Sequence, residues 1–149
     1  MSYNDLRKGR YSETNRIYFV TTVTYKRKPL FNSLYSARIV IQTMKQLDND
    51  EIVDSLSWVV MPDHLHWLIQ LSDEYTLPDV IKRLKAVSAQ RLNKQLNRKG
   101  PIWQPYYHDH SISKEENLKK IARYIVTNPI RAGLTKNINN YSHWDAIWL

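Results

Sequence analysis

The sequence contains no cysteine, which excludes disulfide bonds, thiolate metal sites and cysteine nucleophiles. It has only three glycines, too few and too far apart for a P-loop or a glycine-rich dinucleotide-binding turn. No apolar run approaches the roughly 18 residues that a membrane span requires. The first residues are polar and basic, without the apolar segment of a signal peptide. We therefore expect a cytoplasmic protein without a membrane partner.

Positive charge is what the sequence has in excess. Lysine and arginine number 22 against 14 aspartate and glutamate residues, which gives a formal net charge of +8 over 149 residues. Such a charge favours an anionic partner, above all nucleic acid. The length fits one domain over 1–149, with a basic N-terminal arm over 1–16 and an irregular C-terminal cap over 130–149.

The hydrophobic pattern predicts alternating strands and helices. In chain order these are a strand over 17–25, a helix over 33–47, strands over 52–61 and 64–71, a helix over 77–96, an extended segment over 102–112, and a helix from a capping box at 113–116 to Pro129. A two-residue connection makes the second and third strands antiparallel neighbours. This order is typical of a single-domain ferredoxin-like (split βαβ) α+β sandwich with a central antiparallel sheet.

Two histidines share one face of the strand over 64–71. Its apolar residues alternate and form the expected core face, whereas His64 and His66 point to the face that the main core does not need. Two imidazoles on one face are able to converge on a metal ion or a phosphate. The alternative is a pair of surface or packing histidines beside a turn.

The last predicted helix carries Tyr124 and Asn128 one turn apart, on the flank of its apolar stripe. A tyrosine in such a position usually packs its ring and leaves its hydroxyl in water. A chemical role for Tyr124 therefore requires a partner, and the histidine pair is the candidate.

Taken together, these residues resemble the single-tyrosine HUH transposases, and most of all their REP-associated branch. The resemblance runs from about Arg7 to the Trp-Asp-Ala-Ile-Trp ending. It is carried by His-Leu-His at 64–66 after Pro-Asp, Trp-Gln at 103–104, His110, Tyr-Ile-Val-Thr-Asn-Pro at 124–129 and Arg-Ala-Gly-Leu at 131–134.

The resemblance implies the same ferredoxin-like fold and a DNA strand-transfer chemistry. His64 and His66 would bind a divalent metal, Mg²⁺ or Mn²⁺, and Asn128 would complete the metal site where mobile relatives often carry glutamine. Tyr124 would attack single-stranded DNA, leaving a covalent 5′-phosphotyrosine and a free 3′-hydroxyl. The implied substrate is a palindromic REP hairpin. His110 matches a family position near the active site, and either His110 or a water held by the metal is a candidate general base.

Basic residues are the expected DNA contacts. Arg91, Lys94 and Arg98 share a flank of the helix over 77–96, and Arg7, Lys8 and Arg10 stand in the arm. Trp103 is among the aromatic residues expected to stack on unpaired bases. A protein that acts on chromosomal DNA would be associated with the nucleoid.

Two other functions stay open from the sequence. One is a DNA- or RNA-hairpin-binding module of the same fold that has lost cleavage. The other is a metal-dependent hydrolase that uses His64, His66 and His110, with Tyr124 polarising the substrate. The sequence does not decide between a monomer and a homodimer.

Overall fold

One antiparallel sheet forms the centre of the molecule. The computed structural model describes residues 16–112, 115–137, 141 and 143–146. Its strands are β1 (Ile17–Val23), β2 (Val53–Met61), β3 (His64–Leu71), β4 (His108–Ile112) and β5 (Trp144–Ala146). They lie in the order β4-β1-β3-β2-β5, and every neighbouring pair is antiparallel. The predicted α+β sandwich around a central antiparallel sheet is confirmed.

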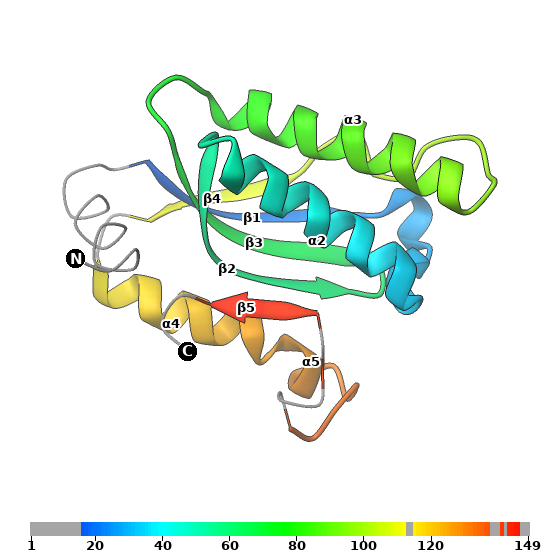
Figure 1. Ribbon diagram of the computed structural model, residues 1–149. Coiled ribbons are helices and arrows are strands. Elements are labelled where there is room, and N and C mark those ends of the chain that lie inside the picture. Colours follow the sequence, from blue (N-terminus) through cyan, green and yellow to red (C-terminus); the bar gives the residue numbers. More distant parts are fainter. Residues whose placement is uncertain (1–15, 113–114, 138–140, 142, 147–149) are drawn as a thin grey trace.

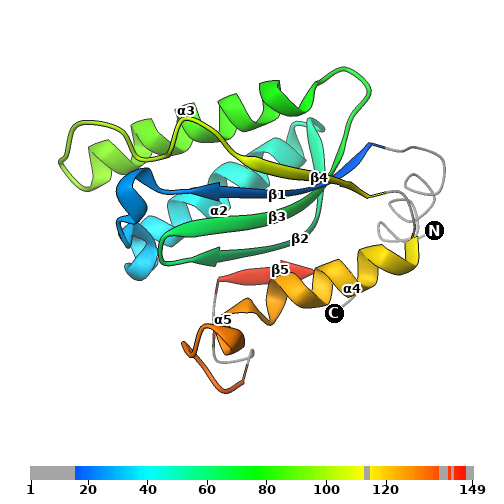
Figure 2. The same cartoon turned by 180° about the vertical axis from the view of Figure 1, so that it is seen from behind.

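Helices cover both faces of this sheet. On one side lie α2 (Leu34–Asn49) and α3 (Leu77–Gln95), and on the other lies α4 (Glu115–Val126), as Figure 1 and Figure 2 show from opposite directions. Two 3₁₀ turns, η1 (Tyr25–Arg27) and η2 (Leu30–Asn32), connect β1 to α2, and α5 (Asn128–Arg131) follows α4. Among the helices of the described ranges, none has the length and apolar character needed to cross a bilayer.

The two faces of β3 enter two separate cores. Trp67 and its apolar neighbours on alternate positions pack against α2 and α3, as the alternation predicts. On the histidine face, Leu68 is buried against Leu118, Ala122 and Ile125 of α4. The expectation that the core does not need this face is therefore wrong for part of the strand, because α4 builds a second core there. His64 and His66 lie in the first half of β3, before Leu68 in the chain.

Differences from the predicted elements concentrate at the C-terminal end. The last helix is predicted to reach Pro129, but α4 ends at Val126 and Pro129 lies in the first turn of α5, where its missing N–H is not needed. The predicted irregular cap includes a strand, since β5 pairs with Ser57–Val59 of β2. The predicted arm up to residue 15 and the first half of the capping box, 113–114, lie outside the described residues.

Trp103 belongs to the core instead of a base-stacking surface. Its side chain is 6% exposed, and its indole Nε1 donates to Ser88 Oγ at 2.9 Å. The Ser88 hydroxyl in turn donates to the Leu84 carbonyl at 2.6 Å, and Phe31 packs against the indole ring. The prediction that Trp103 contacts DNA bases is wrong, because the polar atom of the indole has a buried partner on α3.

Candidate active site

The histidine pair lies on the central strand of the sheet. His66 pairs with Thr21 of β1 on one side and with Val59 of β2 on the other. The ring centroids of His64 and His66 are 4.7 Å apart, and their planes meet at 75°. Both side chains are half-buried. The two imidazoles therefore stand side by side at the sheet surface, as the strand alternation predicts.

Each histidine has its Nδ1 atom engaged inside the protein. His64 Nδ1 lies 2.7 Å from Asp63 Oδ1, and because a carboxylate only accepts hydrogen bonds, the imidazole is the donor. Arg27 Nη1 donates to the other oxygen of Asp63 at 3.3 Å. His66 Nδ1 lies 2.8 Å from Thr21 Oγ1. The bond to Asp63 leaves Nε2 of His64 for a ligand, and Nε2 of His66 is left in the tautomer in which Nδ1 donates to Thr21, which is how neighbouring groups orient metal-binding histidines.

The surroundings shift the pKa values of His66 and Asp63 downward. Burial, followed by the charges of His64 and Arg131, lowers the pKa of His66 to about 3. Burial opposes the charge of Asp63, but hydrogen bonds and charges from His64 and Arg27 outweigh it, so the pKa of Asp63 is lowered. At neutral pH His66 is therefore an uncharged imidazole, the form in which histidine ligates metals.

Tyr124 lies close to the histidine pair although it comes from another layer. Its ring is 52% exposed near the end of α4. The Phe19 ring of β1 connects the two groups, with its centroid 6.4 Å from that of Tyr124 and 5.4 Å from that of His66. Phe19 packs against the core beneath α4 and fixes how closely Tyr124 approaches the sheet. The structure therefore brings together two groups that are far apart in the sequence.

Arg131 folds back from α5 onto Tyr124. The guanidinium carbon is 4.0 Å from the centroid of the Tyr124 ring. Nη2 donates to the Tyr124 carbonyl, and Nη1 donates to Thr127 Oγ1 at 2.6 Å. The charge of Arg131 also acts on His66, so the guanidinium lies within electrostatic reach of the histidine pair.

Asn128 is half-buried at the first position of α5. It stands one turn beyond Tyr124, but the two residues lie on separate helical segments, contrary to the single helix that the sequence predicts. The described part of the chain holds no group of three or more His, Cys, Asp or Glu side chains able to bind a metal. The amide oxygen of Asn128 as a third ligand beside His64 and His66 stays a prediction.

The chain matches a protein-family model described as "Transposase IS200 like" over residues 12–128, which is most of its length. The chain belongs to this family. Because that family comprises the single-tyrosine HUH transposases, the predicted membership and enzyme class are confirmed. The match includes the histidine pair, Tyr124 and Asn128, and it ends before Arg131.

Individual relatives agree with this assignment. The chain is 27% identical to the ISDra2 transposase TnpA of Deinococcus radiodurans over 128 residues, covering 81% of this chain and 89% of the relative. It is 23% identical to the REP-associated tyrosine transposase of Escherichia coli K12, covering 83% and 72%. A solved structure of a REP-associated tyrosine transposase bound to a REP hairpin superposes with a TM-score of 0.71 at 20% identity, covering 87% of this chain and 76% of the other, and supports the fold.

His110 lies on β4 of this transposase, and β1 separates it from the histidine pair on β3. It pairs with Phe19 across β1 and β4, whereas His108 pairs with Thr21, the residue opposite His66. Paired residues of an antiparallel sheet point to the same face, so both histidines share the face of His64 and His66. Both are exposed on the edge strand. A role of His110 next to the reacting groups stays a prediction.

The predicted basic surface of α3 lies in the other layer of the transposase. Arg91 donates to Gln46 Oε1 of α2 at 2.9 Å, and Lys94 is exposed in the last turn. Arg98 lies beyond the end of α3, where Nη1 donates to Asn93 Oδ1 at 3.2 Å, so the prediction that it shares the helix flank is wrong. Because α3 covers the face of the sheet opposite the histidines, a DNA strand that contacts both regions must pass around the edge of the sheet. Arg7, Lys8 and Arg10 lie outside the described residues.

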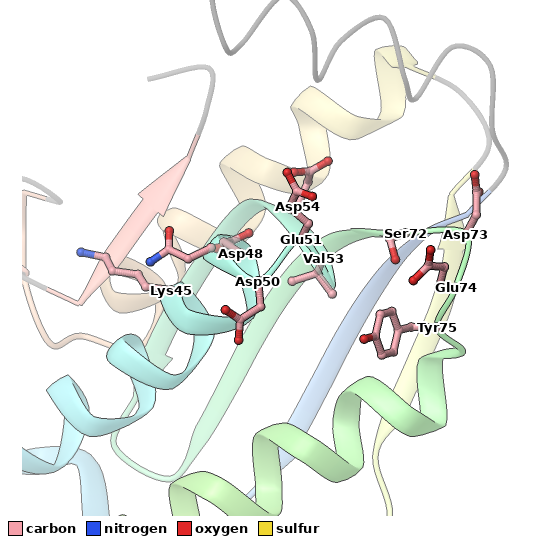
Figure 3. A pocket seen from close by; sticks show the side chains of 11 residues that line it. Lys45, Asp48, Asp50, Glu51, Val53, Asp54, Ser72, Asp73, Glu74 and Tyr75 are labelled. Carbon is pink, nitrogen blue, oxygen red and sulfur yellow. The ribbon is translucent and has the colours of Figure 1, made fainter.

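A hollow lined by acidic residues lies away from the histidine pair. Its volume is about 830 Å³, and it lies where α2 leads into β2 and β3 leads into α3 (Figure 3). Six carboxylates line it, from Asp48, Asp50, Glu51, Asp54, Asp73 and Glu74. His64 begins β3 and the hollow follows its other end, about 26 Å away along the strand. Carboxylates disfavour a nearby DNA backbone, although Arg16, which precedes β1, lies at this same end and pairs with Asp73.

Four neighbours of the site escape the sequence reasoning. Asp63 directly precedes His64, and the sequence indicates only a turn residue there, not a hydrogen bond to the imidazole. Thr21 and Phe19 lie in a strand whose partner is not identifiable from a single sequence. Arg131 belongs to the Arg-Ala-Gly-Leu run that carries the family resemblance, but no spacing rule places its guanidinium on Tyr124.

Proposed function

We propose that this transposase cleaves and rejoins single-stranded DNA beside a hairpin, with Tyr124 as nucleophile and a divalent metal at His64 and His66. The observation that carries the proposal is the common location of the two imidazoles and Tyr124 around the Phe19 ring. The two histidines suit a metal because their Nδ1 atoms are engaged and their Nε2 atoms are available. We assign Asn128 as the third ligand.

The chemistry balances without a nucleotide cofactor. The Tyr124 Oη–P bond forms as the P–O3′ bond breaks, the phenolic proton leaves Tyr124, and a proton joins the departing 3′ oxygen. Bound Mg²⁺ or Mn²⁺ supplies Lewis-acid polarisation of the scissile phosphate. Attack by another 3′-hydroxyl reverses the first step and joins two strands, so the phosphodiester energy is kept in the tyrosine ester.

The solved relative bound to a REP hairpin supports a hairpin substrate for this chain. The net charge of +8 and the acidic hollow at the far end support DNA binding at the histidine end of the sheet. Arg7, Lys8, Arg10 and Lys94 are proposed as backbone contacts, with Arg91 and Arg98 adding charge. A chromosomal substrate would place the protein in the cytoplasm with the nucleoid, as monomer or homodimer.

The first test asks whether a covalent adduct forms. Labelled single-stranded hairpins from repeats near the gene are incubated with the protein and Mg²⁺ or Mn²⁺, and the products are separated on a denaturing gel. We expect a band of protein plus DNA that forms with the metal and does not form when a chelator is present from the start. Cleavage without an attached band would indicate a hydrolase. Hairpin binding without cleavage in both metals would indicate a binding module.

The bond from His64 to Asp63 gives a prediction about metal affinity. Replacing Asp63 with alanine should weaken Mn²⁺ binding about 10- to 100-fold, because His64 loses the acceptor that fixes its ring and tautomer. Titration of Mn²⁺, followed by electron paramagnetic resonance, measures this without any cleavage assay. Asp73→Ala is the matched control, since Asp73 is an exposed carboxylate of the acidic hollow. Equal Mn²⁺ affinity in Asp63→Ala and the wild type would remove Asp63 from this role.

A further inference from the structure

Arg131 makes three contacts with the end of α4 that carries Tyr124. Its guanidinium lies 4.0 Å from the ring centroid, Nη2 donates to the Tyr124 carbonyl, and Nη1 donates to Thr127 Oγ1 at 2.6 Å. An exposed arginine usually samples many rotamers, since its side chain has four flexible torsions. Here the planar fork is tied at two nitrogens and stacked on a ring, a combination that lysine does not reproduce.

The backbone explains why the helix needs such a partner. α4 ends at Val126, and Pro129, in the first turn of α5, has no N–H to offer the Ile125 carbonyl four residues earlier. The last carbonyls of a helix then require donors from outside the helix. The Tyr124 carbonyl receives the Arg131 guanidinium and the Thr127 hydroxyl, the latter at 3.3 Å. A cation at this end also suits the negative end of the helix dipole.

The ring contact has a separate consequence. Tyr124 is 52% exposed, so the packing of α4 alone does not hold its ring in one orientation. Phe19 lies 6.4 Å from it towards the sheet, and Arg131 lies closer, at 4.0 Å. The hydroxyl is left free to meet a phosphate, while its direction is set by these two neighbours.

We propose that Arg131 is the positioning residue of the nucleophile: it fixes the Tyr124 ring and the end of α4 so that the hydroxyl is aimed at the scissile phosphate. This inference rests on the proposed function, in which Tyr124 attacks DNA. It adds a residue that lies beyond the part of the chain matched by the family model. A misplaced reacting group costs rate more than substrate affinity.

The test separates the rate of the covalent step from DNA affinity. With saturating hairpin and Mn²⁺, Arg131→Ala should form the Tyr124 adduct about 100-fold more slowly than the wild type, the loss expected for misplacement by about 1 Å. Hairpin affinity, measured by fluorescence anisotropy, should change less than about 3-fold, since one exposed charge contributes little to total backbone binding. Lys136→Ala, which removes an exposed charge further along the same segment, is the matched control and should keep the wild-type rate.

Two further measurements distinguish positioning from simple stability or charge. Arg131→Lys keeps the charge and should recover only a small part of the rate, because lysine lacks the planar fork. Adding about 20 mM guanidinium chloride should raise the rate of Arg131→Ala several-fold, whereas the same concentration of sodium chloride should not. A variant that is merely unfolded gives no such rescue, and circular dichroism identifies it.

Several results would overturn the inference. These are a wild-type rate in Arg131→Ala, full recovery in Arg131→Lys, or a rate loss matched by an equal loss of hairpin affinity. Failure of the proposed function has a different signature, which is an adduct that persists in Tyr124→Phe. If Tyr124→Phe forms no adduct and Arg131→Ala forms it at the wild-type rate, only the role of Arg131 is rejected.

Discussion

Tyr124→Phe should form no covalent adduct with DNA and should still bind the hairpin with the affinity of the wild type. The substitution removes only the hydroxyl, and the ring keeps its contacts with Phe19 and with the Arg131 guanidinium. Because Tyr124 is 52% exposed, the loss of its hydroxyl should not disturb the core. Removal of a nucleophile that acts together with other groups lowers the rate by several orders of magnitude, at least about 10³-fold.

The measurement for Tyr124→Phe combines a denaturing gel with hairpin binding by anisotropy. Tyr106→Phe is a suitable control, because Tyr106 is similarly exposed, at 58%, and lies ahead of the edge strand β4. It should form the adduct normally. Cleavage that survives in Tyr124→Phe would exclude Tyr124 as the nucleophile and would leave the hydrolase as the better account.

His64→Ala should lower the rate of metal-dependent cleavage by about as much as Tyr124→Phe does, at least about 10³-fold. In the proposed metal site each imidazole is one of two nitrogen ligands, so loss of either should weaken Mn²⁺ binding by more than the roughly 10- to 100-fold expected for a residue that only orients a ligand. His66→Ala should do the same, although His66 is more deeply packed against Phe19 and Thr21. Direct Mn²⁺ titration and the covalent-adduct assay are the two readouts.

The control for the histidine variants is His108→Ala. This residue has the same side chain on the same face of the sheet, at the exposed edge strand, and it should retain Mn²⁺ affinity. Melting temperatures of the metal-free variants show whether the fold survives. If His64→Ala and His66→Ala lose hairpin binding as strongly as cleavage, the pair is a structural element of the DNA-binding surface and not a metal site.

The acidic hollow and the positive net charge together suggest how the molecule is oriented on DNA. Six carboxylates gather at the end of β3 that is far from His64, although basic residues outnumber acidic ones in the whole chain. Uneven charge of this kind directs a polyanion to one end of a protein before any specific contact forms. The carboxylates should therefore disfavour a DNA backbone at the hollow itself.

Alternation along a strand is what the sequence by itself determined most completely. A strand turns its side chains to opposite faces whatever its neighbours are, so the separation of His64 and His66 from Trp67 follows from residue order alone. The spacing of apolar residues likewise determined the α2 and α3 helices, and the two-residue turn made β2 and β3 antiparallel neighbours. The family motif added the predictions of a nucleophile and of metal ligands.

Only the tertiary structure decided which groups surround these residues. Thr21 reaches His66 because β1 pairs with β3 in one particular register, and the pairing of strands distant in sequence depends on the whole sheet. Trp103 is buried because Ser88 offers its indole a partner, which no local pattern reveals. Arg131 reaches Tyr124 because α4 ends at Val126 and α5 starts a new helical segment at Asn128. Local side-chain periodicity is a property of the backbone, whereas these contacts depend on the packing of segments that are distant in sequence.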